Sequence, residues 1–161
     1  MARGKESAGV LLFRNPAELE VLLVHPGGPY WAKKNLGAWS IPKGEPDSGE
    51  ERPECALREM GEELGPAAPR LTAADLIELG SIRQKGGKLV HAWAAEGQFD
   101  PDRLESNSFE FEWPPRSGER REFPEVDRAE WFNPVEARRR INPAQVTLLD
   151  RLDEALGIQV P

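Results

Sequence analysis

Residues 44–66 read GEPDSGEERPECALREMGEELGP and hold the most informative pattern of this chain. Glu59, Glu62 and Glu63 fall within one short segment that is predicted to be helical, directly after Arg58. At 3.6 residues per turn, Glu59 and Glu63 lie on one helix face with Glu62 beside them. Like charges this close repel one another unless a cation lies among them. The pattern therefore predicts a site for a hard divalent cation, Mg²⁺ foremost, which prefers oxygen ligands and commonly acts on phosphates.

A different face of the same segment is apolar. Ala56, Met60 and Leu64 recur at positions i, i+4 and i+8, which is the spacing of a helix face buried against a core. Pro53 suits the first helical turn, and Gly65 suits the end of the helix. The segment is therefore predicted to bury one side and to present carboxylates on another.

This segment resembles the Nudix box, whose pattern is G x5 E x7 R E U x E E x G U, where U is a bulky aliphatic residue. The matching residues are Gly44, Glu50, Arg58, Glu59, Met60, Glu62, Glu63 and Gly65, and Pro66 stands at the final U position. The flanking stretches 39–43 and 124–132 are also similar to the family. The resemblance implies an α/β (α+β) fold, the Nudix-type α/β/α sandwich with a mixed central sheet, as a single domain over residues 1–161.

The rest of the sequence alternates between strand and helix patterns. Strands are predicted at 8–13, 19–24, 38–41, 76–83, 88–96, 108–113 and 129–132, and helices at 134–140 and 144–156. Strands among a few helices indicate a sheet covered by helices. The pattern by itself gives one domain of mixed α and β structure.

Composition narrows the class of protein. A net charge of −7 over 161 residues argues against bulk binding to nucleic acid. A single cysteine excludes an intrachain disulfide and fits a reducing compartment. The N-terminal apolar run is too short for a signal peptide, and no stretch approaches the ~20 apolar residues of a membrane span. We expect a cytoplasmic protein; its oligomeric state stays open, with a homodimer as one alternative.

The resemblance also implies roles for particular residues. Glu59, Glu62 and Glu63 are expected to bind Mg²⁺ or Mn²⁺, with the backbone carbonyl of Lys43 as a further ligand. Glu125, in the loop before the last strand, is an outside candidate for a catalytic or metal-binding acid, and an exposed loop acid is the equal alternative. The residues expected to shape the box are Gly44, Glu50, Arg58 and Gly65, with Arg58 paired to Glu50. The implied reaction is hydrolysis of a diphosphate, NDP–X to NMP and P–X.

The parts of the substrate that do not bind the metal need positively charged side chains for the phosphates and an aromatic ring for the base. Candidates for the phosphates are Lys43, Arg83, Lys85 and Lys88, each of which has a solvated surface charge as its alternative. Tyr30 and Trp113 are candidates for stacking on a base. The lead-in at 39–44 is similar to that of dinucleoside polyphosphate hydrolases. We therefore expect a small-molecule nucleotide substrate, with dinucleoside polyphosphates slightly ahead of nucleoside triphosphates.

A second hypothesis belongs to another class of protein. A Nudix-fold module can bind a nucleotide or a partner without turnover, and such modules usually lose glutamates of the box. This chain keeps all of them, which favours the enzyme.

Overall fold

The computed structural model describes residues 5–158, so the first four residues of the N-terminal segment considered above lie outside it. Its strands are β1 (Glu6–Arg14), β2 (Glu20–Pro26), β3 (Lys43–Gly44), β4 (Ile77–Arg83), β5 (Leu89–Glu96), β6 (Ser108–Glu112), β7 (Arg120–Pro124) and β8 (Val126–Phe132). Its α-helices are α1 (Arg52–Leu64), α2 (Pro134–Arg140) and α3 (Val146–Leu156). Within residues 5–158, no helix combines the length and the apolarity needed to cross a bilayer.

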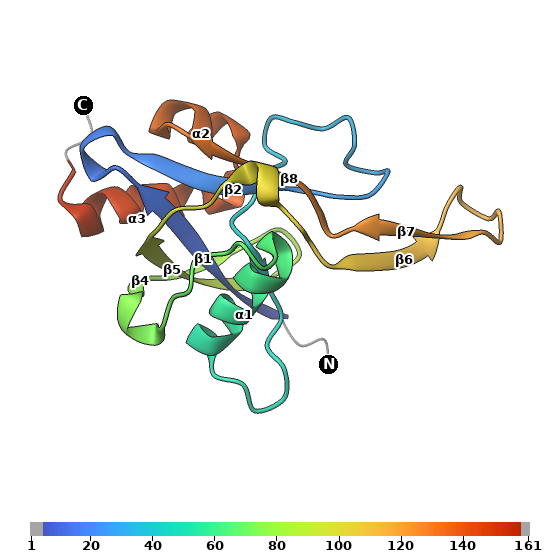
Figure 1. Cartoon of the computed structure of the whole chain (residues 1–161), viewed down its shortest axis with the longest axis horizontal. Helices are drawn as coiled ribbons and strands as arrows, with labels where there is room; N and C mark the ends of the chain where they lie inside the picture. Colours follow the sequence, from blue (N-terminus) through green and yellow to red (C-terminus); the bar gives the residue numbers. More distant parts are fainter. Residues whose placement is uncertain (1–4, 159–161) are drawn as a thin grey trace.

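The central sheet is mixed and six-stranded (Figure 1). Its order is β4-β5-β1-β2-β8, and the short β3 pairs with β1. β1 runs parallel to β5, whereas the pairs β1–β2, β2–β8 and β4–β5 are antiparallel. β1 is buried from Ser7 to Phe13, because a strand in the middle of a sheet that is covered on both faces must be apolar on both sides.

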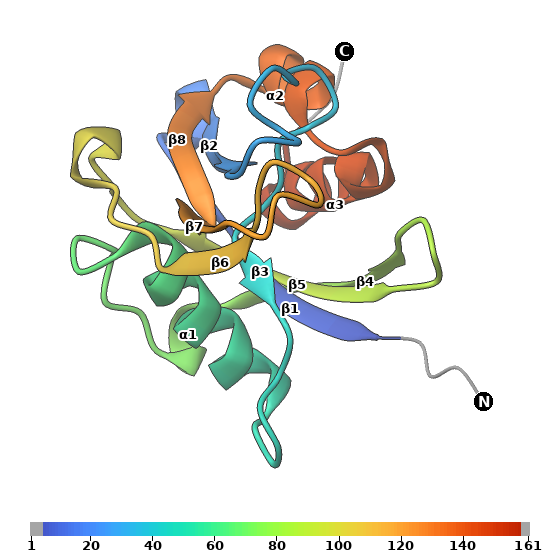
Figure 2. The same ribbon diagram turned by 90° about the vertical axis from the view of Figure 1, so that its right-hand side faces the viewer.

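Helices cover the two faces of this sheet (Figure 2). On one face, α1 packs its predicted stripe of Ala56, Met60 and Leu64 into one apolar cluster. On the other face, α2 and α3 contribute Ala137, Leu148 and other side chains to a second cluster. The α/β/α arrangement expected from the sequence is confirmed.

The predicted strands and helices are present, with three differences. Residues 38–41 form only isolated bridges to Val24 and Ile141, because Pro42 has no N–H to continue a ladder. The strand instead resumes at β3, directly after this proline. The last helix starts at Val146, after a 3₁₀ turn at Pro143–Gln145. β7 was not predicted.

β6 and β7 pair as a separate two-stranded hairpin that extends away from the central sheet (Figure 1). Its inner side carries Phe109, Phe111 and Phe123, whose rings lie 5.2–6.2 Å apart. Phe111 also lies 5.8 Å from the ring of Tyr30, in the loop after β2. The hairpin therefore packs its aromatic side against that loop and not against the main core.

Candidate active site

Arg58 is the centre of an ion-pair network that joins α1 to the loop before it. Its guanidinium donates to both carboxylate oxygens of Glu50, at 2.8 and 2.9 Å, and to the carbonyl of Glu45 at 3.1 Å. This confirms the predicted pair. The Arg58 guanidinium holds the pKa of Glu50 at about 2. The same guanidinium also donates to Glu59, at 2.9 Å, and to Glu62. One arginine thus connects the loop before α1 to two of the box glutamates.

Gly44 is a glycine because Glu59 occupies the space beside it. A Cβ placed on Gly44 would lie 2.0 Å from the carboxyl carbon of Glu59 and 2.2 and 2.4 Å from its oxygens. Residue 44 and residue 59 are therefore in direct contact across the β3–α1 loop. Any side chain at position 44 would displace this carboxylate.

Two further carboxyls lie on the cavity side of the box. Burial raises the pKa of Glu63 to about 8, and the Lys43 charge opposes this rise. Burial also raises the pKa of Glu125, and the negative charge of Glu62 adds to the effect. Both residues line the same cavity. Glu125 follows β7 directly, so the hairpin carries it to the box.

The donor set of this region suits a hard cation, although its side chains are not gathered around one point. Among residues 5–158, no three Asp, Glu, His or Cys side chains come together closely enough to hold an ion. Burial and neighbouring carboxylates raise the pKa values of Glu59, Glu63 and Glu125. A divalent cation would offset that repulsion, and oxygen donors are the ligands that Mg²⁺ and Mn²⁺ accept. The residues therefore fit such an ion.

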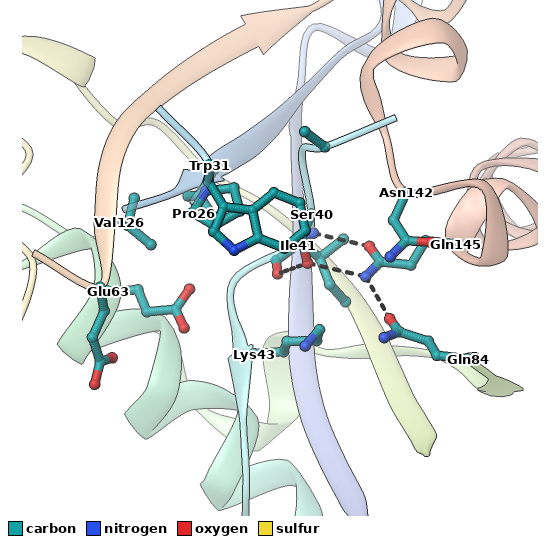
Figure 3. A pocket seen from close by; sticks show the side chains of 13 residues that line it. Pro26, Trp31, Ser40, Ile41, Lys43, Glu63, Gln84, Val126, Asn142 and Gln145 are labelled. Atoms are coloured by element: carbon teal, nitrogen blue, oxygen red, sulfur yellow. Dashed lines mark hydrogen bonds between the residues drawn. The ribbon is translucent and has the colours of Figure 1, made fainter. Parts of the chain in front are cut away.

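A cavity of about 270 Å³ opens beside these glutamates (Figure 3). The residues that line it are Val24, Pro26, Trp31, Ala38, Ser40, Ile41, Lys43, Glu63, Gln84, Glu125, Val126, Asn142 and Gln145. Lys43 lies between Glu63, at the acidic end of the cavity, and the side-chain amides of Gln84 and Gln145 at its other end (Figure 3). Burial together with the nearby charge of Lys88 lowers the pKa of Lys43. The cavity therefore joins carboxylates, one cation, one indole and a group of side-chain amides.

The amide end is organised by Gln145, which is fully buried. Its Oε1 accepts from the backbone N–H of Ile41 at 3.1 Å. Its Nε2 donates to Ser40 Oγ at 3.0 Å and to Gln84 Oε1 at 2.8 Å, as Figure 3 shows. These bonds connect the loop before β3, the end of β4 and the turn before α3.

Trp31 belongs to the loop between β2 and β3, and the hairpin supports this loop. The Gly27 N–H donates to the Glu125 carbonyl at 2.9 Å, and the Tyr30 ring packs on Phe111. Trp31 follows directly and is 40% exposed at the mouth of the cavity. An exposed indole beside a polar cavity is a surface on which a flat ring can stack.

The predicted site residues fall into two groups. Lys43, Glu63 and Glu125 line the cavity. Glu59 and Glu62, the other two predicted metal ligands, lie on α1 and are not among its lining residues. The residues predicted for substrate that do not line it are Arg83, Lys85, Lys88, Tyr30 and Trp113.

Three of these five residues have other partners. Arg83 donates to the Gly87 carbonyl in the β4–β5 turn at 3.1 Å. The Tyr30 ring meets Trp113 edge to face at 5.2 Å, so these two rings pack on each other. Neither ring lines the cavity, so their candidacy for stacking on a base stays a prediction.

Sequence reasoning missed the amides and undervalued Trp31. Gln84, Asn142 and Gln145 carry no local pattern, because Gln84 follows β4 whereas Asn142 and Gln145 belong to the turn before α3. Trp31 had a signal, since an aromatic residue in a loop with Pro26, Gly27, Gly28 and Pro29 is seldom core.

The sequence profile of the NUDIX domain family matches residues 5–152. An 8-oxo-(d)GTP phosphatase of Mycolicibacterium smegmatis is 33% identical over 112 residues, which is 60% of this chain. The match covers only 31% of that longer protein.

Solved structures share the fold. The Ap4A hydrolase of C. elegans, in a binary complex, superposes with a TM-score of 0.64 at 21% identity, over 94% of this chain and 98% of that one. The NUDIX domain of Shewanella oneidensis NrtR, complexed with ADP ribose, gives a TM-score of 0.63 at 16% identity, over 97% and 90%. At these identities, both similarities show a common fold and nothing further.

Proposed function

The chain belongs to the NUDIX domain family, and we propose that it hydrolyses a diphosphate bond in a nucleoside or dinucleoside polyphosphate. One observation carries the proposal. A single cavity has the carboxylates of Glu63 and Glu125 at one end, side-chain amides at the other and the Trp31 indole in its wall (Figure 3). A nucleotide has the matching polarity, because its phosphates bind cations and its base stacks and forms hydrogen bonds.

The box supplies the ligands for a divalent cation in this proposal. Glu59, Glu62, Glu63 and the Lys43 carbonyl would hold Mg²⁺ or Mn²⁺, which when bound neutralises phosphate charge and acidifies a bound water. Glu50 and Arg58 fix the helix and its loop, much as outer groups orient metal ligands.

Two cavity residues act directly on the substrate. The Lys43 ammonium lies in the cavity wall near Glu63 and attracts a phosphate oxygen. Glu125 enters the cavity from the hairpin side and is not part of the box. Its carboxyl has a raised pKa, which brings it closer to the range in which a carboxylate accepts a proton from water effectively. We assign Glu125 the role of general base.

The relatives agree with a nucleotide substrate. One is named an 8-oxo-(d)GTP phosphatase and another an Ap4A hydrolase. These names cover both a nucleoside triphosphate and a dinucleoside polyphosphate, so the proposal includes both classes.

The test is a panel of nucleoside triphosphates, dinucleoside polyphosphates and nucleotide sugars with Mg²⁺, followed by quantification of the products. We expect at least one member to be cleaved to a mononucleotide, and chelation to abolish the reaction. Glu63→Gln should reduce kcat by at least about 100-fold with an unchanged melting temperature. Glu54→Gln is the matched control, because Glu54 is exposed on the same helix and should keep full activity.

The same experiment decides against the alternative of a binding module without turnover. That alternative requires the panel to remain intact with Mg²⁺ and with Mn²⁺, and requires Glu63→Gln to leave nucleotide binding unchanged. This outcome would refute the hydrolase proposal.

A further inference from the structure

The amide end of the cavity has a fixed hydrogen-bond polarity. The backbone N–H of Ile41 can only donate, so the Gln145 atom that faces it at 3.1 Å must be the oxygen. The Gln145 nitrogen is then turned towards Ser40 and Gln84. Ser40 uses its own hydrogen to donate to the Ile41 carbonyl at 2.7 Å, so its oxygen is free to accept.

This chain of bonds sets the orientation of Gln84. Because Gln145 donates to it at 2.8 Å, Gln84 must present its oxygen to Gln145 and its NH₂ group on the other side. Within residues 5–158, no protein acceptor meets that NH₂ group, and the side chain lines the cavity (Figure 3). Gln84 therefore offers the cavity hydrogen-bond donors.

Asn142 has the same polarity for an independent reason. Its Oδ1 accepts from the backbone N–H of Ala144 at 2.9 Å, where it caps the turn before α3. The amide nitrogen is the end that is left over, and Asn142 also lines the cavity. Trp31 also lines the cavity, and the one polar group of its indole, the N–H, is a donor as well. The end of the cavity remote from the glutamates thus presents donors from two side chains, and Trp31 adds a third donor to the cavity wall.

A wall of donors selects a base that presents acceptors. Guanine carries O6 and N7 side by side, both acceptors, whereas adenine carries the N6 amino donor next to N7. Adenine would place its amino group against the Gln84 amino group. A cavity of about 270 Å³ is near the lower end of ligand pockets, roughly 300–1,000 Å³, so it takes one base.

We propose that Gln84, oriented by Gln145, selects guanine over adenine in the nucleotide that this cavity binds. Gln84 and Asn142 donate to the O6/N7 edge, and Trp31 stacks on the ring. This inference rests on the proposed function and deepens it, because it names the base and the residue that recognises it.

The test compares kcat/KM for GTP and ATP, and for dGTP and dATP, in the intact protein. We expect a preference for the guanine nucleotide of roughly tenfold or more, the value of one well-formed base contact. Gln84→Glu turns the donor into an acceptor and should abolish or reverse that ratio. Gln98→Glu makes the same charge change at an exposed residue outside this cavity and should keep the wild-type ratio.

A second variant tests the orientation without changing Gln84. In Gln145→Glu the buried group can only accept, so Gln84 must turn its NH₂ group towards it and its oxygen towards the cavity. The ratio of kcat/KM for guanine over adenine nucleotides should therefore fall in this variant too. Affinities for GMP and AMP, measured by Trp fluorescence without metal, give the same comparison independently of turnover and of folding losses in either variant.

The outcomes separate the two proposals. Hydrolysis of GTP and ATP within about twofold of each other, or a Gln84→Glu ratio equal to the wild-type ratio, overturns the base assignment and leaves the hydrolase standing. Absence of any hydrolysis refutes the hydrolase, while the GMP and AMP affinities still decide the base.

Discussion

Replacing Gly44 by alanine should abolish the proposed hydrolysis while the protein stays folded. The new Cβ would lie 2.0 Å from the Glu59 carboxyl carbon, where ordinary contact begins at 3.4 Å. The carboxyl must therefore withdraw by roughly 1.4 Å. A displacement of about 1 Å at a reacting centre can reduce the rate by about 100-fold. We expect kcat/KM of Gly44→Ala to fall by at least that factor, and Mn²⁺ affinity to weaken.

Stability should change little, because the displaced group is the end of a flexible side chain. The free energy of unfolding, measured with urea, is expected to stay within about 1 kcal/mol of wild type. Gly61→Ala is the matched control. Gly61 lies on the same helix, and a Cβ there meets nothing within 4 Å, so activity should be unchanged and the helix slightly more stable. A Gly44→Ala protein with activity within threefold of wild type would refute the assigned position of Glu59.

Three further predictions concern the aromatic hairpin, the pH dependence of stability and the pH dependence of metal binding. Phe111→Ala removes the ring that packs on Tyr30, so the loop with Trp31 should become more mobile. KM should then rise several-fold with kcat unchanged. A fall in kcat as large as the rise in KM would contradict this. The pKa of Glu63 is raised to about 8 from an ordinary 4.5, so the folded metal-free protein binds this proton more tightly than the unfolded chain. Its unfolding free energy should therefore decline as pH rises from about 4.5 to about 8. Mg²⁺ binding should release close to one proton at pH 7 and almost none at pH 9, as calorimetry in buffers of different ionisation enthalpy measures; equal release at both pH values would contradict the assignment.

The box was predictable because its geometry is local. The burial of Ala56, Met60 and Leu64 follows from helical spacing alone. The bond between Arg58 and Glu50 spans only eight residues within one recognisable motif. The sandwich followed from the resemblance, since alternating strands and helices by themselves gave only a mixed domain.

The amide end was not predictable because it is built from distant segments. Gln145 is separated in the sequence by 61 residues from Gln84 and by 105 from Ser40, its two hydrogen-bond acceptors. No periodic pattern in a sequence indicates polar contacts of this kind. A lone glutamine in a sequence is most simply a surface residue. Only the folded chain shows that Gln145 is buried and that its bonds orient its neighbour.

β7 was not predicted, for a related reason. Its sequence, RREFP, has three charged residues in a row and ends in proline, so it lacks the alternation of a half-buried strand. It becomes a strand by pairing with β6. Arg83 and Lys85, predicted as candidates for the phosphates, do not line the cavity, because closeness to a turn in the sequence says nothing about which way that turn faces.

The most direct measurement is the anomalous difference map of a crystal that contains Mn²⁺ and a slowly hydrolysed nucleotide analogue. We expect an ion within roughly 2–2.3 Å of carboxylate oxygens of Glu59 and Glu63, with the phosphates on that ion and the base between Trp31 and Gln84. An ion bound at other residues, or a nucleotide seated outside this cavity, would contradict the account.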